Sequence, residues 1–281
     1  MGDAVFERAL DLFRRLPPST VENDMVNALN LVPDLMEDLL SAVDQPLKVL
    51  TCPETSKPFI VCDYNRDGES YRSPWSNAYT PPMDDGITPP DELRKLEISA
   101  NEVFNKYREV YYEAGSVSSC YFWEVDGGFA CCVAINKSAA PKKHPIAEDA
   151  DPKTALESEG SWMAIHVVEA AVDDKAATAS YKLTTTVMLD LASKSSGMGN
   201  SSQISGNLTR TSEKSKGFSA PHDHIANIGE MVEQMEGRVR ESLYEVYFGK
   251  TAEVISQART PDRPDRGLTG NLMAEMMARN T

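Results

Sequence analysis

The sequence predicts an α+β protein with a five-stranded antiparallel sheet between helical segments. Three observations support this class. Apolar residues recur with helical spacing near the N-terminus and again over residues 91–114. After Gly115 the period of the apolar pattern changes from 3.6 to 2, which indicates strands. The longest helical pattern then begins at His224 and carries one apolar seam, so we expect it to cross the sheet.

The first 45 residues predict three short helices that pack as an antiparallel layer. The first spans 3–16 and ends at two prolines. The second follows with Thr20 as its N-cap, although its capping box is incomplete because Asn23 stands at the third helical position. The third runs from Pro33 to about Val43. Residues 1–45 are therefore expected to form one helical domain.

Residues 46–90 are rich in proline and are predicted to form an irregular globule. They contain the run DYNRDGESYRSPWSN at 63–77, whose first six letters match the opening of a calcium loop. The closing position is Pro74, which has no carboxylate, and prolines flank the run where an EF-hand needs helices. We therefore expect no calcium site but a polar turn after a short strand, with Asp and Asn bonding to nearby backbone N–H groups.

A helix is predicted from Asp91 to Ala114, and the next domain, 91–220, adds the sheet. The apolar residues expected to face mostly inward on this helix are Leu93, Leu96, Ile98, Val103, Phe104, Tyr107 and Val110. Five strands with short connections follow, which indicates an antiparallel meander. They are predicted at 117–125, 128–136, 162–171, 177–192 and about 203–211. Asp126-Gly127 is a strong hairpin signal, whereas the polar stretches 137–160 and 193–202 are predicted to be mobile loops.

The last predicted helix spans about 224–258 within a domain at 221–258. At about 1.5 Å per residue it would be roughly 50 Å long, so its seam must cross a broad sheet or another subunit. Pro261 and Pro264 end the pattern, and 259–281 is a short tail. The apolar residues clustered toward one face of the tail are Leu268, Leu272, Met273, Met276 and Met277.

The composition of the chain argues against several classes of function and location. The chain has 281 residues with a net charge of −15, which argues against nucleic acid as a partner of the whole surface. It has no apolar run of 18 residues, so no transmembrane segment is expected. Charged residues at the N-terminus replace the apolar core of a signal peptide, which predicts a cytoplasmic location. The five cysteines show no CxxC spacing and are predicted to be buried or partly buried free thiols.

The sequence contains no catalytic constellation that we can identify. It has four histidines, and His222-Asp223-His224 supplies at most two metal ligands, so we expect these residues to mark the start of the long helix. His166 lies within a strand and is predicted to be a half-buried structural residue. There is no GxSxG, no P-loop and no GxGxxG after a strand. The protein is therefore predicted not to be an enzyme, and we expect no cofactor and no metal.

Six blocks in the chain resemble the β subunit of the heterodimeric actin-capping protein family, in the family's order. These are the run at 63–77, LRKLE at 93–97, IHVVE at 165–169, YKLTTTVML at 181–189, HIANIG at 224–229 and YFGKT at 247–251. The resemblance implies a three-helix stalk, a small globule, a five-stranded sheet under a long helix, and a C-terminal amphipathic tentacle. It also implies an α subunit whose sheet continues this one into a ten-stranded platform.

The resemblance implies calcium-independent capping of the barbed ends of actin filaments, which blocks addition and loss of subunits, and a place in the cytoskeleton. The resemblance also implies capping regulators and phosphoinositides as partners. Residues 237–281 hold seven Lys/Arg against six Asp/Glu, or +1, which leaves −16 for the rest of the chain. The family docks on actin through a basic patch and the tentacle. The actin-binding residues implied here are Arg238, Arg240, Arg259, Leu268, Leu272, Met273 and Met276.

Three alternatives stay open at this point. The tail could pack on its own body instead of entering a groove on actin as an amphipathic helix, and each arginine taken singly could belong to a solvated helix face. The chain could also serve as a scaffold subunit of a larger, dynactin-like assembly without free capping.

Overall fold

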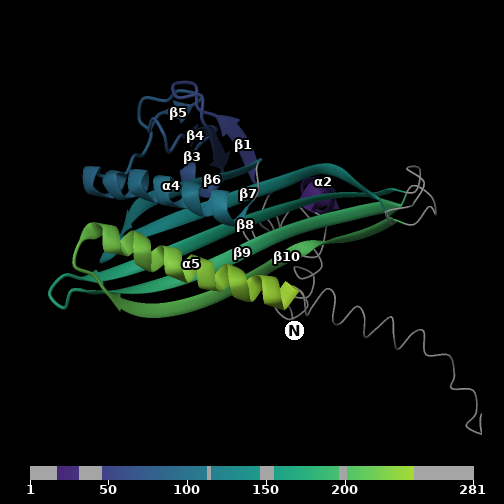
Figure 1. The fold of residues 1–281 in the computed structure, drawn as a ribbon. Helices are drawn as coiled ribbons and strands as arrows, with labels where there is room; N and C mark the ends of the chain where they lie inside the picture. The colour runs from purple at the N-terminus through teal and green to yellow at the C-terminus, as the bar shows by residue number, and fades with distance from the viewer. Residues whose placement is uncertain (1–17, 32–45, 113–114, 146–154, 196–200, 244–281) are drawn as a thin grey trace, which may run out of the picture. The chain divides into compact units, whose positions relative to one another are not determined.

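The computed structural model describes residues 18–31, 46–112, 115–145, 155–195 and 201–243 (Figure 1). The chain divides into two compact units, 1–236 and 237–281. The first unit is α+β, and its main feature is a five-stranded antiparallel sheet with helices, as predicted. Within the described residues, no helix is both long enough and apolar enough to cross a membrane.

The sheet is a simple meander, in which each strand pairs with its neighbour in the sequence, in the order β10-β9-β8-β7-β6. The strands are β6 Ser116–Val125, β7 Gly128–Pro145, β8 Ala155–Asp173, β9 Thr178–Ser195 and β10 Ser201–Gly217. The predicted two-residue turn joins β6 and β7, and Gly127 adopts a φ of 77° that favours glycine. Gly128 must also lack a side chain, because a Cβ would lie 1.9 Å from the carbonyl oxygen of Ala170.

The prediction that 137–160 and 193–202 are loops was wrong over much of their length. β7 continues to Pro145, and its register with β8 includes Lys142 opposite Ser158 and Lys143 opposite Glu157. β9 and β10 likewise extend into the second stretch. Antiparallel pairing uses backbone groups that every non-proline residue has, so polar composition did not prevent strand formation. The two segments between these strands, 146–154 and 196–200, lie outside the described residues.

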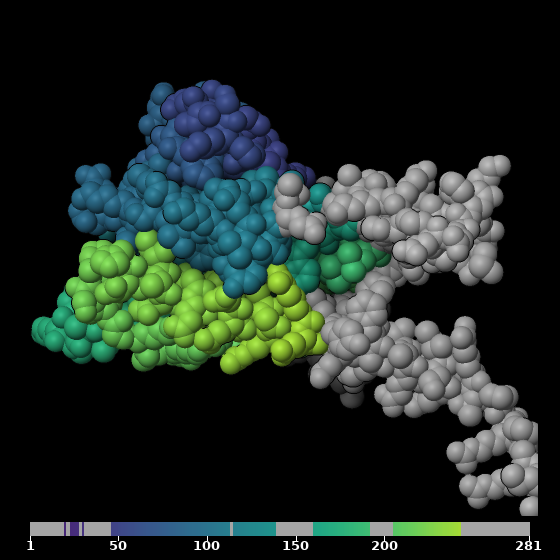
Figure 2. Space-filling model, in the orientation of Figure 1, coloured from purple at the N-terminus to yellow at the C-terminus, as the bar shows by residue number. Residues whose placement is uncertain are grey.

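One face of the sheet is covered by the part of the helix α5 (Pro221–Leu243) that belongs to the first unit (Figure 1). Its seam residues in the first unit, Ile225, Ile228, Val232 and Met235, are buried as predicted. Figure 2 shows α4 and α5 side by side over this face. The rest of the predicted helix, beyond Leu243, lies outside the described residues.

The helix α4, Asp91–Tyr111, lies along β6, but its predicted inward face was partly wrong. Ile98 and Val103 are 45% and 46% exposed and Val110 is 76% exposed. The buried residues of α4 are Phe104, as predicted, and Glu97, Ala100 and Asn101, which were not predicted. Glu97 and Asn101 bond to neighbouring segments, and these polar contacts set which side of the helix turns inward.

The helix α2, Pro18–Leu31, contacts β9 and buries Met25. It begins at Pro18, so the prediction that Thr20 is the N-cap was wrong. Proline suits the first turn of a helix, where no intrahelical partner exists for its missing N–H. The predicted helices 3–16 and 33–43 lie outside the described residues.

Residues 46–90 are less irregular than predicted, because they form two small sheets. The strands are β1 Lys48–Thr51 with β2 Pro58–Val61, and β3 Arg66–Asp67, β4 Ser70–Arg72 and β5 Tyr79–Thr80. Strands of two to four residues are too short to show a period in the sequence.

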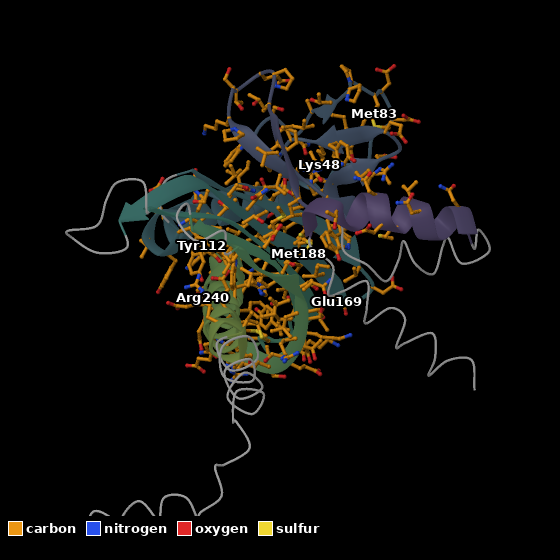
Figure 3. All side chains as sticks on the ribbon, turned by 90° about the vertical axis from the view of Figure 1, so that its right-hand side faces the viewer. Lys48, Met83, Tyr112, Glu169, Met188 and Arg240 are labelled. Carbon is orange, nitrogen blue, oxygen red and sulfur yellow. The ribbon has the colours of Figure 1, made fainter. Side chains whose placement is uncertain are left out.

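The hairpin of β1 and β2 packs on the face of the large sheet opposite α5. Ile60 N donates to the Ser119 hydroxyl at 2.9 Å, and the Asn136 amide donates to Leu47 O at 2.8 Å. The apolar cluster at this contact includes Leu47, Ile60 and Met188. Figure 3 shows Met188 inside the body and Met83 at the far side of the small sheets.

Candidate functional site

The run at 63–77 opens with a turn after β2, as expected, and continues into β3 and β4. Asp63–Asn65 forms a single 3-10 turn after β2, and Asn65 is buried. The Asn65 side chain accepts a hydrogen bond from Cys62 N at 2.9 Å and donates to Arg72 O at 2.8 Å, so its oxygen is already in use. No group of three or more His, Cys, Asp or Glu side chains suited to a metal occurs within the described ranges.

The same run supplies one half of a buried ion pair that the sequence did not reveal. The Arg72 guanidinium donates two hydrogen bonds to the Glu97 carboxylate, at 2.8 and 2.7 Å, and the two side chains are 4% and 0% exposed. Glu97 also accepts from Phe122 N at 2.8 Å and from Arg94. Burial would lower the pKa of Arg72, but Glu97 outweighs it and the pKa is raised. The pair therefore joins the small sheets, α4 and β6.

A second buried carboxylate, Glu236 of α5, joins that helix to the sheet and to α4. His166 Nε2 lies 3.2 Å from the Glu236 carboxylate, and the hydroxyls of Tyr107 and Tyr112 donate to it. Burial would raise the pKa of Glu236, but these bonds, led by His166, lower it. His166 is completely buried rather than half-buried, and its Nδ1 lies 2.9 Å from the Thr185 hydroxyl. Tyr112 is labelled beside α5 in Figure 3.

The start of α5 is held by the residues predicted to mark it. Asp223 accepts hydrogen bonds from Ser219 N and Ala220 N, which lower its pKa. His224 is buried among aromatic rings, and its Nδ1 lies 2.6 Å from the Tyr181 hydroxyl. Farther along, Lys214 and Lys216 of β10 bond to Gln234 and Glu230 of α5.

We expect the stability of the folded protein to depend on pH through the protonation of His224. Burial lowers the pKa of His224 below 6.5, so the unfolded chain binds this proton more readily than the folded one. The folded state should therefore lose stability as pH falls below about 6.5. Melting temperatures measured from pH 8 to pH 5 should fall less steeply for His224→Gln, which cannot titrate. Parallel curves for the two proteins would contradict this assignment.

The two edges of the large sheet differ. The outer edge of β6 is covered by side chains of α4: Asn101 exchanges two hydrogen bonds of 2.9 Å with the backbone of Cys120, and Arg108 donates to Ser116 O at 2.6 Å. β10, at the other edge, pairs with β9 alone among the described strands. A long strand with an open edge is a template for pairing with another chain.

The predicted site residues are only partly described. Arg238 and Arg240 are exposed on α5, on either side of the buried Val239. Residues two apart on a helix are about 200° apart around its axis, so these arginines face different sides of α5. The other predicted actin-binding residues, Arg259, Leu268, Leu272, Met273 and Met276, lie outside the described part of the chain.

The sequence prediction missed the two buried carboxylates. Glu97 and Glu236 lie on amphipathic helices, where acids are usually exposed, so their sequence positions do not show that they are buried. The partners themselves, Arg72 and His166, carry no local mark in the sequence.

A scan against known families matches residues 6–255 to the family described as F-actin capping protein, beta subunit. The chain belongs to this family. The family is non-enzymatic, in agreement with the prediction.

Curated β subunits extend the match over the whole chain. This β-subunit chain is 45% identical over 285 residues to the F-actin-capping protein subunit beta of Drosophila melanogaster, covering 100% of this chain and 98% of that protein. It is 46% identical to the same subunit of Aspergillus oryzae, covering 92% and 91%. It is 43% identical to that of Caenorhabditis elegans, covering 94% and 92%.

A solved structure agrees with the fold. The homodimeric actin capping protein alpha subunit from Plasmodium berghei matches with a TM-score of 0.51 at 16% identity, covering 92% of this β-subunit chain and 96% of that chain.

Proposed function

We propose that this chain is the β subunit of a heterodimeric actin-capping protein, which binds the barbed ends of filaments without calcium and blocks addition and loss of actin subunits. It works in the cytoskeleton. The family membership carries the assignment. Binding needs no covalent chemistry, which is consistent with carboxylates that are used for structure.

The open β10 edge supports a partner subunit. An α subunit would add its own strands along this edge and extend the five strands to ten. The difference between the edges favours this side, because α4 side chains already occupy the backbone groups of β6. Pairing at β10 would also remove the aggregation hazard of an open strand.

We infer a division of the chain into five parts. Residues 1–45 would form a helical stalk, 46–90 the globule, 91–220 the helix and sheet, 221–258 the long helix and 259–281 the actin-binding tentacle. The globule, sheet and start of the long helix correspond to β1–β5, β6–β10 and α5.

Co-expression with an α subunit tests the function. We expect a 1:1 heterodimer that stops elongation of actin filaments from their barbed ends in a seeded polymerisation assay, equally with calcium or a chelator. The chain alone should be poorly soluble. A stable monomer that melts cooperatively, or a heterodimer that leaves seeded elongation unchanged, would overturn the proposal. The second result would favour a scaffold role.

We expect the tail, residues 259–281, to slow dissociation of the protein from the filament. Replacing Leu272 and Met276 with serine is expected to leave heterodimer melting almost unchanged but to shorten the residence time on barbed ends. Buried apolar anchors act mainly on dissociation, and about twelve residues form a marginal helix without a partner. Dissociation can be timed by filament regrowth after dilution. A large fall in melting temperature with normal release would show that the tail packs on its own body.

A further inference from the structure

Two of the five free cysteines lie in the same apolar cluster, where the small sheets pack on the large one. Cys62 follows β2, and Cys132 lies in β7. Cys62 packs against the apolar cluster that contains Cys132, and the proximity of the Cys62 thiol contributes to the raised pKa of the Cys132 thiol. They come from segments that are far apart in the sequence, so only the tertiary structure brings them together.

The two thiols differ in access to solvent. Cys62 is partly exposed, whereas Cys132 and the other three cysteines are buried. Cys62 is also held in place, because its backbone N–H bonds to the Asn65 side chain. A small oxidant from solvent would therefore reach Cys62 first, with a second thiol already beside it.

We propose that Cys62 and Cys132 form a redox-sensitive dithiol that closes to a disulfide in the presence of a peroxide. Hydrogen peroxide oxidises the Cys62 thiol to a sulfenic acid, and one oxygen of the peroxide leaves as water. The Cys132 sulfur then attacks the sulfenic sulfur and forms the S–S bond. The hydroxyl of the sulfenic acid leaves with the Cys132 proton as a second water.

The second step should be slow at neutral pH. Burial raises the pKa of Cys132 well above its usual value, and the thiolate is the attacking species. We therefore expect the disulfide to form faster at pH 8.5 than at pH 7.

The disulfide would connect the turn after β2 to the centre of the large sheet. It would close a loop of roughly 70 residues, long enough to restrict the unfolded chain substantially. Oxidised heterodimer should therefore melt several degrees above the reduced form, and dithiothreitol should reverse the shift.

The test uses the intact heterodimer, treated with hydrogen peroxide at pH 7 and pH 8.5 and digested without reduction. We expect a peptide pair linked through Cys62 and Cys132, with a mass about 2 Da below the sum of the reduced peptides, since a disulfide loses two hydrogens. Cys62→Ala should abolish it. Cys131→Ala is the matched control, because Cys131 is adjacent but faces the other side of β7, and it should leave the disulfide intact.

Three results would overturn the proposal: sulfinic acid at Cys62 with no disulfide, linkage of Cys62 to a different thiol, or an unreactive Cys62. The test rests on the proposed heterodimer, but its readout is a mass that does not depend on actin capping, so failure of the dithiol and failure of the capping function can be told apart.

Discussion

Replacing Glu97 with alanine should cost about 3–5 kcal/mol of the free energy of unfolding, the range found when one partner of a buried ion pair is removed. The change leaves the Arg72 guanidinium buried with its bidentate partner gone, although Asn77 still accepts one of its hydrogen bonds at 2.7 Å. It also leaves Phe122 N without the carboxylate that accepts from it. Three segments lose their common contact at once.

Urea unfolding of the heterodimer at fixed protein concentration measures this effect, because association contributes to apparent stability. Glu92→Ala is the matched control: Glu92 is an acid on the same helix, 80% exposed and paired with Lys95, and its loss should leave the midpoint nearly unchanged. A double variant, Arg72→Met with Glu97→Leu, should recover much of the loss, since it removes both buried charges. Equal effects of Glu97→Ala and Glu92→Ala would refute the role given to this pair.

The second large effect concerns association with the filament. Reversing the charge at Arg240 and Arg259 together should slow capping about tenfold or more at low salt, and should change release less. The basic patch implied by the family resemblance would meet an acidic surface on actin, and cations at the rim of an interface act mainly on the encounter rate. The difference from wild type should shrink as added salt reduces the screening length to about 8–10 Å.

The matched control for charge is Lys106→Glu with Lys175→Glu, two exposed lysines of the first unit. It changes the net charge by the same amount at sites that the proposal does not assign to actin. Capping rates can be measured from the decay of seeded elongation over a range of salt concentrations. If both double variants slow capping equally, net charge alone explains the effect and the site assignment fails.

Variants that change Arg238 or Arg240 singly would distinguish the contributions of these two arginines to actin binding. Because Arg238 and Arg240 face different sides of α5, a flat contact with actin should use one of them more than the other. The resemblance to the family had placed them in one set.

The sequence by itself determined the order of the elements and the face that several of them bury. The change of period after Gly115, the Asp126-Gly127 turn and the seam at Ile225, Ile228 and Val232 are local signals, because side-chain direction repeats along a strand or helix. The six ordered blocks also identified the family.

Tertiary structure alone decided the polar contacts and the extent of the sheet. Arg72 and Glu97 are 25 residues apart, and Glu236 meets a histidine 70 residues away, so no local pattern marks these pairs. The polar ends of β7–β10 became strand because a neighbouring strand satisfied their backbone groups. Periodicity reports which side of an element is apolar, whereas a buried charge is stable only where the fold brings its partner.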